Sequence, residues 1–478
     1  MAVSTAPVVV TWVHAVKSIL WGDGFMDFST EPNTQALAQK LEAFIERYVL
    51  PYNPAWHHAV ALGEYPPHFV EDLKALAKEA GLWNIFLPEL GPLEPGTRLS
   101  HSAYAPLAEM MGKLPWSAEV FNCQAPDSGN MALLHQFGSK AQKDAWLTPL
   151  LNGEMRSAFA MSEPDVASSD PTNLQTTARD AGEAYVLNGR KWFITGAAHP
   201  NCKVLLVMCR NENATSTLDE SPNADQANKH RQHSILLVPI DTPGLEIVRN
   251  ISVIHHVAPE GHCEIVFRQV RVPKENLLGE WGEGFKMGQL RLGPGRVHHC
   301  MRTLGQCELA LSLAAERCLE RETFGHHLSE YASVQEWLAL SRIEIDQARL
   351  LIMQVAWMLD QEAVDRSLLS AKVAAMKVVA ARLQVRVLDR AMQIFGAMGL
   401  SPDTPLAFFW TWGRALQIMD GPDEVHLRTV ARHELSQAKK RFGASSNYFT
   451  TPAQMAKPPH VHEVRFSLAE SIALNEIT

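Results

Sequence analysis

The sequence predicts an α+β protein in which a helical domain, a β domain and a second, longer helical domain follow one another. Two observations support this fold class. Apolar residues recur at helical spacing in the first and last thirds of the chain, and short β-prone runs bounded by turn residues fill the middle. With 478 residues, of which 46% are hydrophobic and 20% charged, the chain is long enough for two or three packed domains.

The first helical domain is expected over residues 35–156, after an N-terminal arm of residues 1–34. Its clearest segments, QALAQKLEAFIERYVL and PPHFVEDLKALAKEAGLW, are separated by Pro and Gly. The arm contains APVVVTWVHAVKSILWG, which polar residues interrupt before it reaches the length of a membrane span. The arm contains one Lys and no Arg, so it also makes a poor transit peptide.

A middle β domain is expected over residues 157–276. YVLNGRKWFIT places Asn188 and Gly189 between two β-prone runs, which is the strongest short signal for a β-hairpin. The runs KVLLVMCR, HSILLVPI, GLEIVRNI and CEIVFRQVRVP then continue as far as Pro273. The polar stretch over residues 211–232 predicts a mobile surface insertion between two strands.

Long helices with apolar seams are expected over residues 277–442. Two seams step alternately by four and three residues, as in helical bundles. The first comprises Val334, Leu338, Ser341, Ile345, Ala348, Ile352, Val355 and Leu359, and the second Leu369, Val373, Met376, Ala380, Leu383 and Val387. Core packing explains both seams, because they carry almost no side chains that bind metals or cofactors. The turn-rich residues 443–478 are expected to lie over the surface or against a partner subunit.

The net charge and the cysteines narrow the classes of function. A formal charge of −9 argues against a general nucleic-acid surface, while a local basic pocket for a phosphorylated ligand remains compatible with it. Seven scattered cysteines without a C-x-x-C pair indicate buried thiols in a reducing compartment. Adjacent histidines such as His298 and His299 lack the spacing of metal ligands, so we expect no metal site and interpret them as ordinary core or surface residues.

Asp420 stands immediately before a Gly-Pro pair and a helical run, in MDGPDEVHLRTVARHEL. These residues alone leave two interpretations open. In the first, Asp420 caps the helix, and Pro422 occupies the first turn, where proline is favoured. In the second, Gly421 lets the backbone turn tightly, so that Asp420 projects into a pocket as a base. The two roles are compatible with each other.

Five sequence motifs occur in a specific order. SAFAMSEPDVASSDPTNLQTTA leads into YVLNGRKWFITGA, and RETFG, AMQIFGAMG and RALQIMDGPDEVH follow. Together they strongly resemble the acyl-CoA dehydrogenase family over residues 35–442, and in particular the branch that includes family members ten and eleven. The resemblance implies a helical N-terminal domain, a middle β-barrel or β-sandwich and a C-terminal four-helix bundle. It also implies a homodimer or homotetramer that holds FAD between the β domain and the bundle.

Three residues of the β domain match family positions at the flavin. Ser162 in MSEP and Thr195 in KWFIT offer hydroxyl groups for hydrogen bonds to the ring. Phe193, beside Trp192, adds aromatic surface for a planar group. Without the family context, Ser162 would be read as a turn residue and the strand residues as core.

Four residues of the bundle match family positions at the FAD of a neighbouring subunit. Arg321 in RETFG suits a pyrophosphate, because its guanidinium offers several donors and a positive charge. Phe324, Gln393 and Gly396 accompany it in the family. Without the other motifs, Arg321 would be read as a solvated cation at a helix end.

Asp420 matches the family's catalytic base, which removes the α-proton of an acyl-CoA thioester while the β-hydride passes to flavin N5. Such a step requires a base with a raised pKa in a dry site. The commoner family residue is Glu, and the shorter Asp leaves three interpretations: a base in a re-shaped site, a base elsewhere, or a different chemistry such as that of nitroalkane oxidases. The first bundle helix offers no carboxylate in GQLRLGPGRVHHCMRTLG, which weakens the second interpretation.

The predicted function is FAD-dependent α,β-dehydrogenation of an acyl-CoA to the 2-enoyl-CoA. The resemblance places Arg296, Ser168, Ser169 and Gly421 at the substrate, and implies electron-transfer flavoprotein or oxygen as electron acceptor. The alternatives are a flavin oxidase of the same fold acting on a non-CoA substrate and, less favoured, a non-catalytic scaffold. The expected compartment is the mitochondrion or the peroxisome, otherwise the cytoplasm. The ending ALNEIT lacks the S-K-L signal, and neither a nucleic-acid partner nor a membrane span is expected.

Overall fold

The computed structural model of the protein describes residues 32–212, 230–442 and 448. The chain divides into two compact units, Met1–Val430 and Ala431–Thr478. The described helices and strands all belong to the first unit, apart from the end of helix α15 (Asp423–Lys440). Most of the predicted arm 1–34, insertion 211–232 and tail 443–478 lies outside the described residues.

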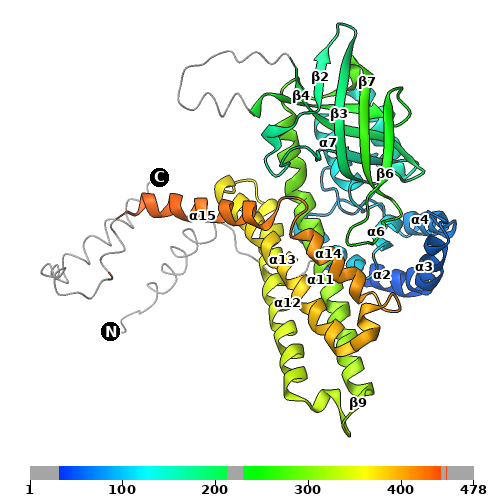
Figure 1. Cartoon of the computed structure of the whole chain (residues 1–478), viewed down its shortest axis with the longest axis vertical. Helices are drawn as coiled ribbons and strands as arrows, with labels where there is room; N and C mark the ends of the chain where they lie inside the picture. The colour runs from blue at the N-terminus through cyan, green and yellow to red at the C-terminus, as the bar shows by residue number, and fades with distance from the viewer. Residues whose placement is uncertain (1–31, 213–229, 443–447, 449–478) are drawn as a thin grey trace, which may run out of the picture. The chain divides into compact units, whose positions relative to one another are not determined.

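Helices form the N-terminal part of the first unit (Figure 1). Helices α2 (Pro32–Phe44) and α4 (Phe69–Glu79) lie in the two segments that the sequence predicts to be helical. Along α4, Val70, Leu73 and Ala77 share one face and are buried, which explains the spacing of its apolar residues. The other helices here are α3 (Asn53–Ala61), α5 (His101–Gly112), α6 (Ser117–Val120), α7 (Asp127–Phe137), α8 (Lys140–Gln142) and α9 (Thr148–Asn152).

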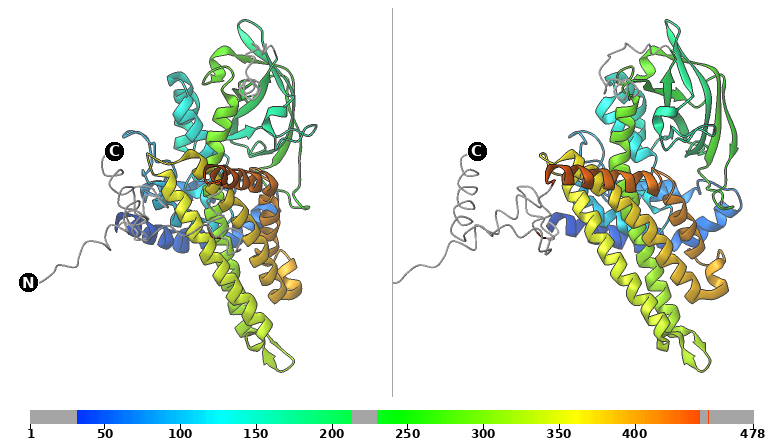
Figure 2. Two further views of the ribbon diagram at one scale, coloured as in Figure 1. Left: turned by 90° about the vertical axis from the view of Figure 1, so that its left-hand side faces the viewer. Right: turned by 60° about the vertical axis from the view of Figure 1, so that its left-hand side comes forward.

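An eight-stranded sheet follows, and it curves rather than lying flat (Figure 2). Its path runs in the order β6-β7-β3-β2-β4-β5-β8, and β1 pairs in parallel with β4. The strands are β1 (Arg156–Ala160), β2 (Thr177–Asp180), β3 (Ala184–Thr195), β4 (Cys202–Asn211), β5 (His233–Pro239), β6 (Leu245–Asn250), β7 (His262–Pro273) and β8 (Leu277–Leu278). The four β-prone runs of the sequence therefore lie in β4, β5, β6 and β7.

Strand β4 is buried on both faces. Val204 and Leu206 belong to the core that the sheet shares with the helices, whereas Leu205 and Val207 belong to a second core within the sheet domain. Because side chains alternate between the two faces of a strand, an uninterrupted apolar run such as KVLLVMCR supplies both cores at once.

The Asn188-Gly189 pair does not form the hairpin turn that the sequence predicts. Strand β3 continues through it and pairs with β7 on both sides, with a shift in register between Leu187 and Gly189. Gly189 has a φ of 148°, and a Cβ atom there would lie 2.5 Å from the hydroxyl oxygen of Thr176. The pair therefore makes a β-bulge over Thr176. The tight turn that precedes β3 contains Gly182 instead.

Three long helices and one shorter helix form the C-terminal bundle: α11 (Gly284–Glu320), α12 (Ala332–Leu359), α13 (Arg366–Phe395) and the shorter α14 (Leu406–Leu416) (Figure 1). The two predicted seams face its core, and only Leu338, Leu359 and Leu369 among their members are half-buried. A small hairpin of β9 (Glu322–Thr323) and β10 (His326–His327) links α11 to α12.

Helices α5 and α11 touch along their backbones at two glycines. A Cβ atom on Gly305 would lie 1.9 Å from the carbonyl oxygen of Glu109, and one on Gly112 would lie 2.1 Å from that of Arg302. Both distances are too short for any side chain. The N-terminal helices are therefore packed directly onto the longest helix of the bundle.

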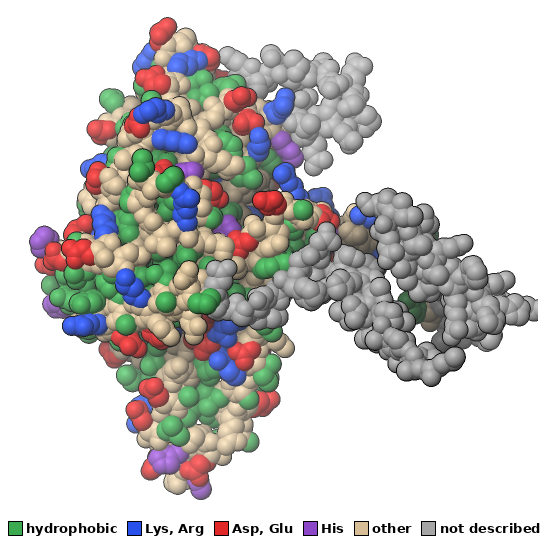
Figure 3. Space-filling model, turned by 180° about the vertical axis from the view of Figure 1, so that it is seen from behind, with side chains coloured by type: hydrophobic (Ala, Val, Ile, Leu, Met, Phe, Trp, Pro, Cys, Tyr) green, Lys and Arg blue, Asp and Glu red, His purple; other side chains and the backbone are tan. Residues whose placement is uncertain are grey.

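The face shown in Figure 3 carries acidic and basic side chains mixed with apolar ones. All seven cysteines are free and buried, as the sequence predicts. Within the part of the chain that the structure describes, no helix is long and apolar enough to cross a membrane.

Candidate active site

Asp420 lies in the short connection between α14 and α15. Its backbone adopts a left-handed conformation, with a φ of 54°, and Gly421 follows with a φ of 100°. Among non-glycine residues, Asp and Asn tolerate this conformation best, and strained residues of this kind cluster at functional sites. Within the described chain the Asp420 carboxylate accepts no hydrogen bond from the first turn of α15, so the predicted cap is not formed by this side chain.

Three side chains hold the carbonyl groups of this turn. The Nε of Arg296 on α11 donates to the Asp420 carbonyl oxygen at 2.9 Å, and the Nε2 of His426 on α15 contacts the same oxygen at 3.2 Å. The Nζ of Lys377 on α13 donates to the Gly421 carbonyl oxygen at 2.6 Å. Because an unpaired buried carbonyl costs free energy, these contacts stabilise a turn that the backbone alone disfavours.

Gly421 is required by the same arrangement. A Cβ atom at this position would lie 2.8 Å from the His426 Nε2, and a φ of 100° is one that other residues rarely adopt. A side chain here would therefore displace the ring that contacts Asp420. Gly421 thus shapes the turn that carries the carboxylate.

The surroundings of the Asp420 carboxylate are rich in positive charge. Burial raises the pKa of this carboxylate, but nearby cations lower it and prevail, so the pKa lies below its ordinary value of 3.8. The largest lowering effect comes from His299, which is charged only when its ring is protonated, and Arg291, Arg296 and Lys377 follow. The pKa of Asp420 is therefore lowered, whereas the family mechanism led us to expect a raised pKa.

The predicted flavin residues of the β domain lie together. The Trp192 N–H donates to the Ser162 carbonyl oxygen at 3.0 Å, which brings the segment after β1 against the end of β3. Phe193 is 42% exposed, with its ring centroid 5.0 Å from that of Trp192. Half-buried Thr195 completes a group of exposed aromatic surface and hydroxyl groups, which fits a planar heteroaromatic ring.

A buried ion pair that the sequence analysis missed supports this group. The Nζ of Lys191 lies 2.8 Å from the Glu163 Oε1 and also donates to the Met161 carbonyl oxygen. Both side chains are almost fully buried. Met161 and Glu163 flank Ser162, so the pair fixes the segment that carries the Ser162 hydroxyl. Their only signal in the sequence was their presence inside the MSEP and KWFIT motifs.

His262 is a second residue that the sequence analysis missed. Its Nδ1 lies 3.0 Å from the Thr195 hydroxyl, and burial lowers the pKa of His262 to about 4. The imidazole is therefore neutral near pH 7. It is a candidate for orienting the hydroxyl of Thr195.

The predicted substrate residues Ser168 and Ser169 differ in their surroundings. The Ser168 hydroxyl accepts a hydrogen bond of 2.8 Å from the Glu163 N–H, so it closes its own loop. Ser169 is exposed. Of this pair, only Ser169 has a side chain that is open to a bound molecule.

Arg321, Phe324, Gln393 and Gly396 lie at the far end of the bundle. Arg321 follows the last residue of α11, about 37 Å along that helix from Arg296 at 1.5 Å per residue. The ends of α11 and α13 meet there, since Arg317 lies over the Phe395 ring at 5.6 Å. Arg321 and Gln393 are exposed, and Phe324 is 94% exposed with a φ of 50°. Within one chain, the structure does not bring these four residues to Asp420.

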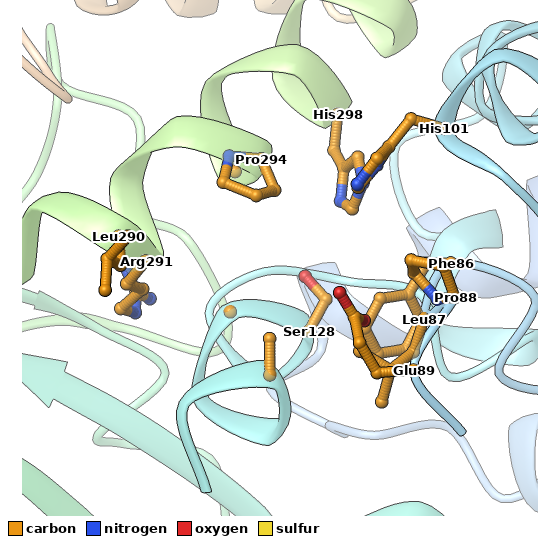
Figure 4. A pocket seen from close by; sticks show the side chains of 13 residues that line it. Phe86, Leu87, Pro88, Glu89, His101, Ser128, Leu290, Arg291, Pro294 and His298 are labelled. Carbon is orange, nitrogen blue, oxygen red and sulfur yellow. The ribbon is translucent and has the colours of Figure 1, made fainter. Parts of the chain in front are cut away.

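A pocket lies between α11, α7, the start of α5 and the segment Phe86–Glu89 that precedes α5 (Figure 4). It is lined by Phe86, Leu87, Pro88, Glu89, His101, Ser128, Gly129, Ala132, Leu290, Arg291, Pro294, Gly295 and His298. Arg291 belongs both to this lining and to the charges that act on Asp420. The pocket and the carboxylate therefore share one stretch of α11. Among the described residues, no cluster of three or more His, Cys, Asp or Glu side chains could hold a metal ion.

Comparison with known proteins gives a consistent assignment. The N-terminal, middle and C-terminal domain models of acyl-CoA dehydrogenase match residues 31–154, 158–270 and 282–435. "Probable acyl-CoA dehydrogenase FadE2" of Mycobacterium tuberculosis is 48% identical over 435 residues, which cover 90% of this chain and 98% of the relative. Acyl-CoA dehydrogenase family member 10 of Mus musculus is 44% identical over 86% of this chain, and family member 11 of Homo sapiens is 41% identical over 86%. The match spans only 37% and 51% of those two relatives.

Solved structures agree with the sequence comparison. A protein assigned as an acyl-CoA dehydrogenase from Mycobacterium abscessus superposes with a TM-score of 0.79 at 43% identity, covering 86% of this chain and all of the other. Butyryl-CoA dehydrogenase from Megasphaera elsdenii gives a TM-score of 0.69 at 27% identity, with the same coverage of both chains.

Proposed function

The chain belongs to the acyl-CoA dehydrogenase family, and from this premise we propose that it oxidises an acyl-CoA thioester to the 2-enoyl-CoA. FAD, when bound, would accept the β-hydride of the substrate. Asp420 would accept the α-proton. The observation that carries the proposal is the turn of Asp420 and Gly421, whose carbonyl groups are held by Arg296, His426 and Lys377.

The geometry of this turn suits a carboxylate base. The contacts to both backbone carbonyl groups fix the position of the Asp420 Cα atom. The side chain of Asp is shorter than that of Glu, so the position of its carboxylate depends more strongly on the position of the backbone. The lowered pKa keeps the carboxylate ionised near pH 7 and ready to accept a proton. The surrounding cations would also stabilise negative charge that develops on the thioester as the proton leaves.

The residues of the β domain suit the flavin. Trp192 and Phe193 would supply aromatic surface, and the hydroxyl groups of Ser162 and Thr195 would bind polar atoms of the ring. The buried Lys191–Glu163 ion pair would keep the Ser162 segment in place.

Residues at the far end of the bundle suit a second copy of the chain. Arg321, Gln393 and Gly396 lie too far along the bundle from Asp420 to share its flavin, yet they match family positions at FAD. Together with the exposed Phe324, they would complete the cofactor site of a neighbouring subunit. This arrangement requires at least a homodimer.

The pocket along α11 would take the acyl group, because Arg291 both lines it and acts on Asp420. A chain attached to the reacting carbons would extend along α11 between Gly295 and Ser128. Ser169 and Arg296 would face the CoA portion. Electron-transfer flavoprotein is the proposed electron acceptor. A solved chain described with the "Electron transferring flavoprotein of Acidaminococcus fermentans" shares this fold, with a TM-score of 0.69 at 25% identity.

The test is an anaerobic absorbance spectrum of the FAD-bound protein before and after addition of a panel of acyl-CoAs. We expect an acyl-CoA to bleach the oxidised flavin band, and Asp420→Asn to keep that band but lose the bleaching. Asp241→Asn, which changes an exposed carboxylate, is the matched control. Full bleaching in Asp420→Asn would remove this residue from the reaction. Bleaching by nitroalkanes alone would instead assign the Asp to an oxidase.

A further inference from the structure

His299 on α11 lies between Asp420 and Arg302. Its Nε2 is 3.5 Å from the Asp420 Oδ2, and its Nδ1 is 3.3 Å from the Arg302 guanidinium. The carboxylate therefore faces one ring nitrogen and the guanidinium faces the other. Arg302 is itself held by a contact of 3.3 Å to the Cys123 carbonyl oxygen.

This arrangement determines which ring nitrogen of His299 carries the proton. A guanidinium group only donates hydrogen bonds, so the His299 Nδ1 must accept from Arg302. In a neutral imidazole the proton then sits on Nε2, which is the nitrogen facing Asp420. His299 thus presents an N–H group to the carboxylate.

His299 is a neutral donor rather than a cation. Burial lowers the pKa of His299 to about 4, the cations Arg302, Arg291 and Lys377 add to this effect, and Asp420 opposes it. A neutral N–H binds a carboxylate without neutralising its charge. The distance of 3.5 Å is longer than a formed hydrogen bond, and contacts of this kind commonly tighten when substrate binds.

We propose that His299 is a positioning residue for Asp420: its Nε2–H holds the Oδ2 oxygen and leaves Oδ1 free to take the substrate proton, while Arg302 fixes the imidazole tautomer. The inference rests on the proposed function for its catalytic consequence only. The backbone turn fixes the start of the Asp420 side chain, and His299 fixes its end. A short base is thereby held at one position.

The neighbouring His298 shows that this role belongs to one histidine of the pair. His298 is buried on another side of α11, where its ring packs 4.9 Å from that of Tyr104 and lines the pocket. Consecutive helical residues point about 100° apart, so the two rings serve different surroundings.

The first experiment needs no substrate. In FAD-bound protein labelled with nitrogen-15 at histidine, His299→Gln assigns the His299 signals in the NMR spectrum. We expect a protonated Nε2 and an unprotonated Nδ1, and a shift of the Nε2 signal in Asp420→Asn. A proton on Nδ1, or no response to Asp420→Asn, would overturn the proposal whatever reaction the protein catalyses.

The second experiment compares His299→Leu with His299→Gln. We expect His299→Leu to slow flavin reduction by about tenfold to hundredfold with little change in KM, since a misplaced group costs rate rather than affinity. Gln can donate from nearly the same place as Nε2 and should recover most of the rate. His58→Gln, on the exposed surface of α3, is the control.

Two results are distinguishable by this design. If His299→Leu reduces its flavin as fast as the unchanged protein, the positioning role is wrong and the dehydrogenase function stands. If no acyl-CoA bleaches the unchanged protein, the proposed function fails, and the NMR measurement still decides whether His299 holds Asp420.

Discussion

Lys377 donates a hydrogen bond of 2.6 Å from its Nζ to the carbonyl oxygen of Gly421. Its side chain has no exposed surface, and burial lowers the pKa of Lys377 to about 8, against the opposing effect of Asp423. A buried ammonium group is thus retained to hold one carbonyl of a strained turn. Helix α13 in this way controls the position of a carboxylate that belongs to a different element.

Replacing Lys377 by Met should slow flavin reduction while FAD stays bound. The lost donor leaves the Gly421 carbonyl oxygen unpaired, which costs about 1–3 kcal/mol of folding stability. Rapid-mixing absorbance gives the rate, and urea unfolding gives the stability. Lys113→Met, at an exposed position, should change neither. An unchanged reduction rate in Lys377→Met would show that the turn does not depend on this contact.

The value of kcat/KM should not fall through protonation of Asp420 between about pH 8 and pH 5. This parameter reports the ionisation of groups in the free enzyme. A carboxylate base works when deprotonated, and the pKa of Asp420 lies below 3.8, so its protonation begins only in acid. Arg296→Met removes one of the cations and should move the acid limb to higher pH. An acid limb near neutral pH in the unchanged protein would contradict the charge arrangement seen in the structure.

Glu119→Gln should destabilise the fold by about 3 kcal/mol, because removing one partner of a buried ion pair leaves the other uncompensated. The Glu119 Oε1 lies 2.8 Å from Arg156 and 3.4 Å from Lys74, and all three side chains are less than 10% exposed. Asp144→Asn removes an exposed ion pair with Lys140 and should cost little. Urea unfolding at neutral pH compares the two.

The same carboxylate gives the unfolding free energy a predictable dependence on pH. Burial raises the pKa of Glu119, but Arg156 and its other partners prevail and lower it below the ordinary value of 4.5. The unfolded chain therefore binds a proton first, and the stabilisation is complete above about pH 4.5 and declines as the pH falls further. Glu119→Gln should lose this part of the acid sensitivity. If the unchanged protein and Glu119→Gln lose the same stability in acid, the acid sensitivity comes from other groups.

Gly305→Ala should destabilise the protein by about 3 kcal/mol, because the new Cβ would overlap the Glu109 carbonyl oxygen and force α5 away from α11. Gly293→Ala in the same helix is the matched control, since a Cβ there meets nothing within 4 Å. The control should be neutral or stabilising by up to about 1 kcal/mol through helix propensity. Equal thermal midpoints for the two variants would show that the helices separate without cost.

Local patterns in the sequence were enough to predict the order of the domains and the faces of the bundle helices. The seam residues Ile345 and Met376 are fully buried, because helical periodicity by itself determines which face is apolar. The Asn188-Gly189 prediction was wrong because a long-range partner decided it. Thr176 packs where a side chain on Gly189 would lie, and β7 pairs with β3 on both sides of the bulge.

The candidate site could be predicted only in part for the same reason. The motif identified Asp420, but the charges around it come from Arg291 and Lys377, which lie far from it in the sequence. His299 resembled any other histidine of an adjacent pair until folding placed it beside the carboxylate. Which atoms surround a base is a property of tertiary packing, and spacing along one segment carries no information about it.

The alternating burial of strand β4 predicts how its residues vary among relatives. Its even-numbered residues Val204 and Leu206 pack with the helices, and its odd-numbered residues Leu205 and Val207 pack within the sheet domain. Substitutions at alternate positions are therefore tolerated or rejected by different neighbours. In an alignment of relatives, the two sets should covary with different partners, so that one strand preserves two separate evolutionary records.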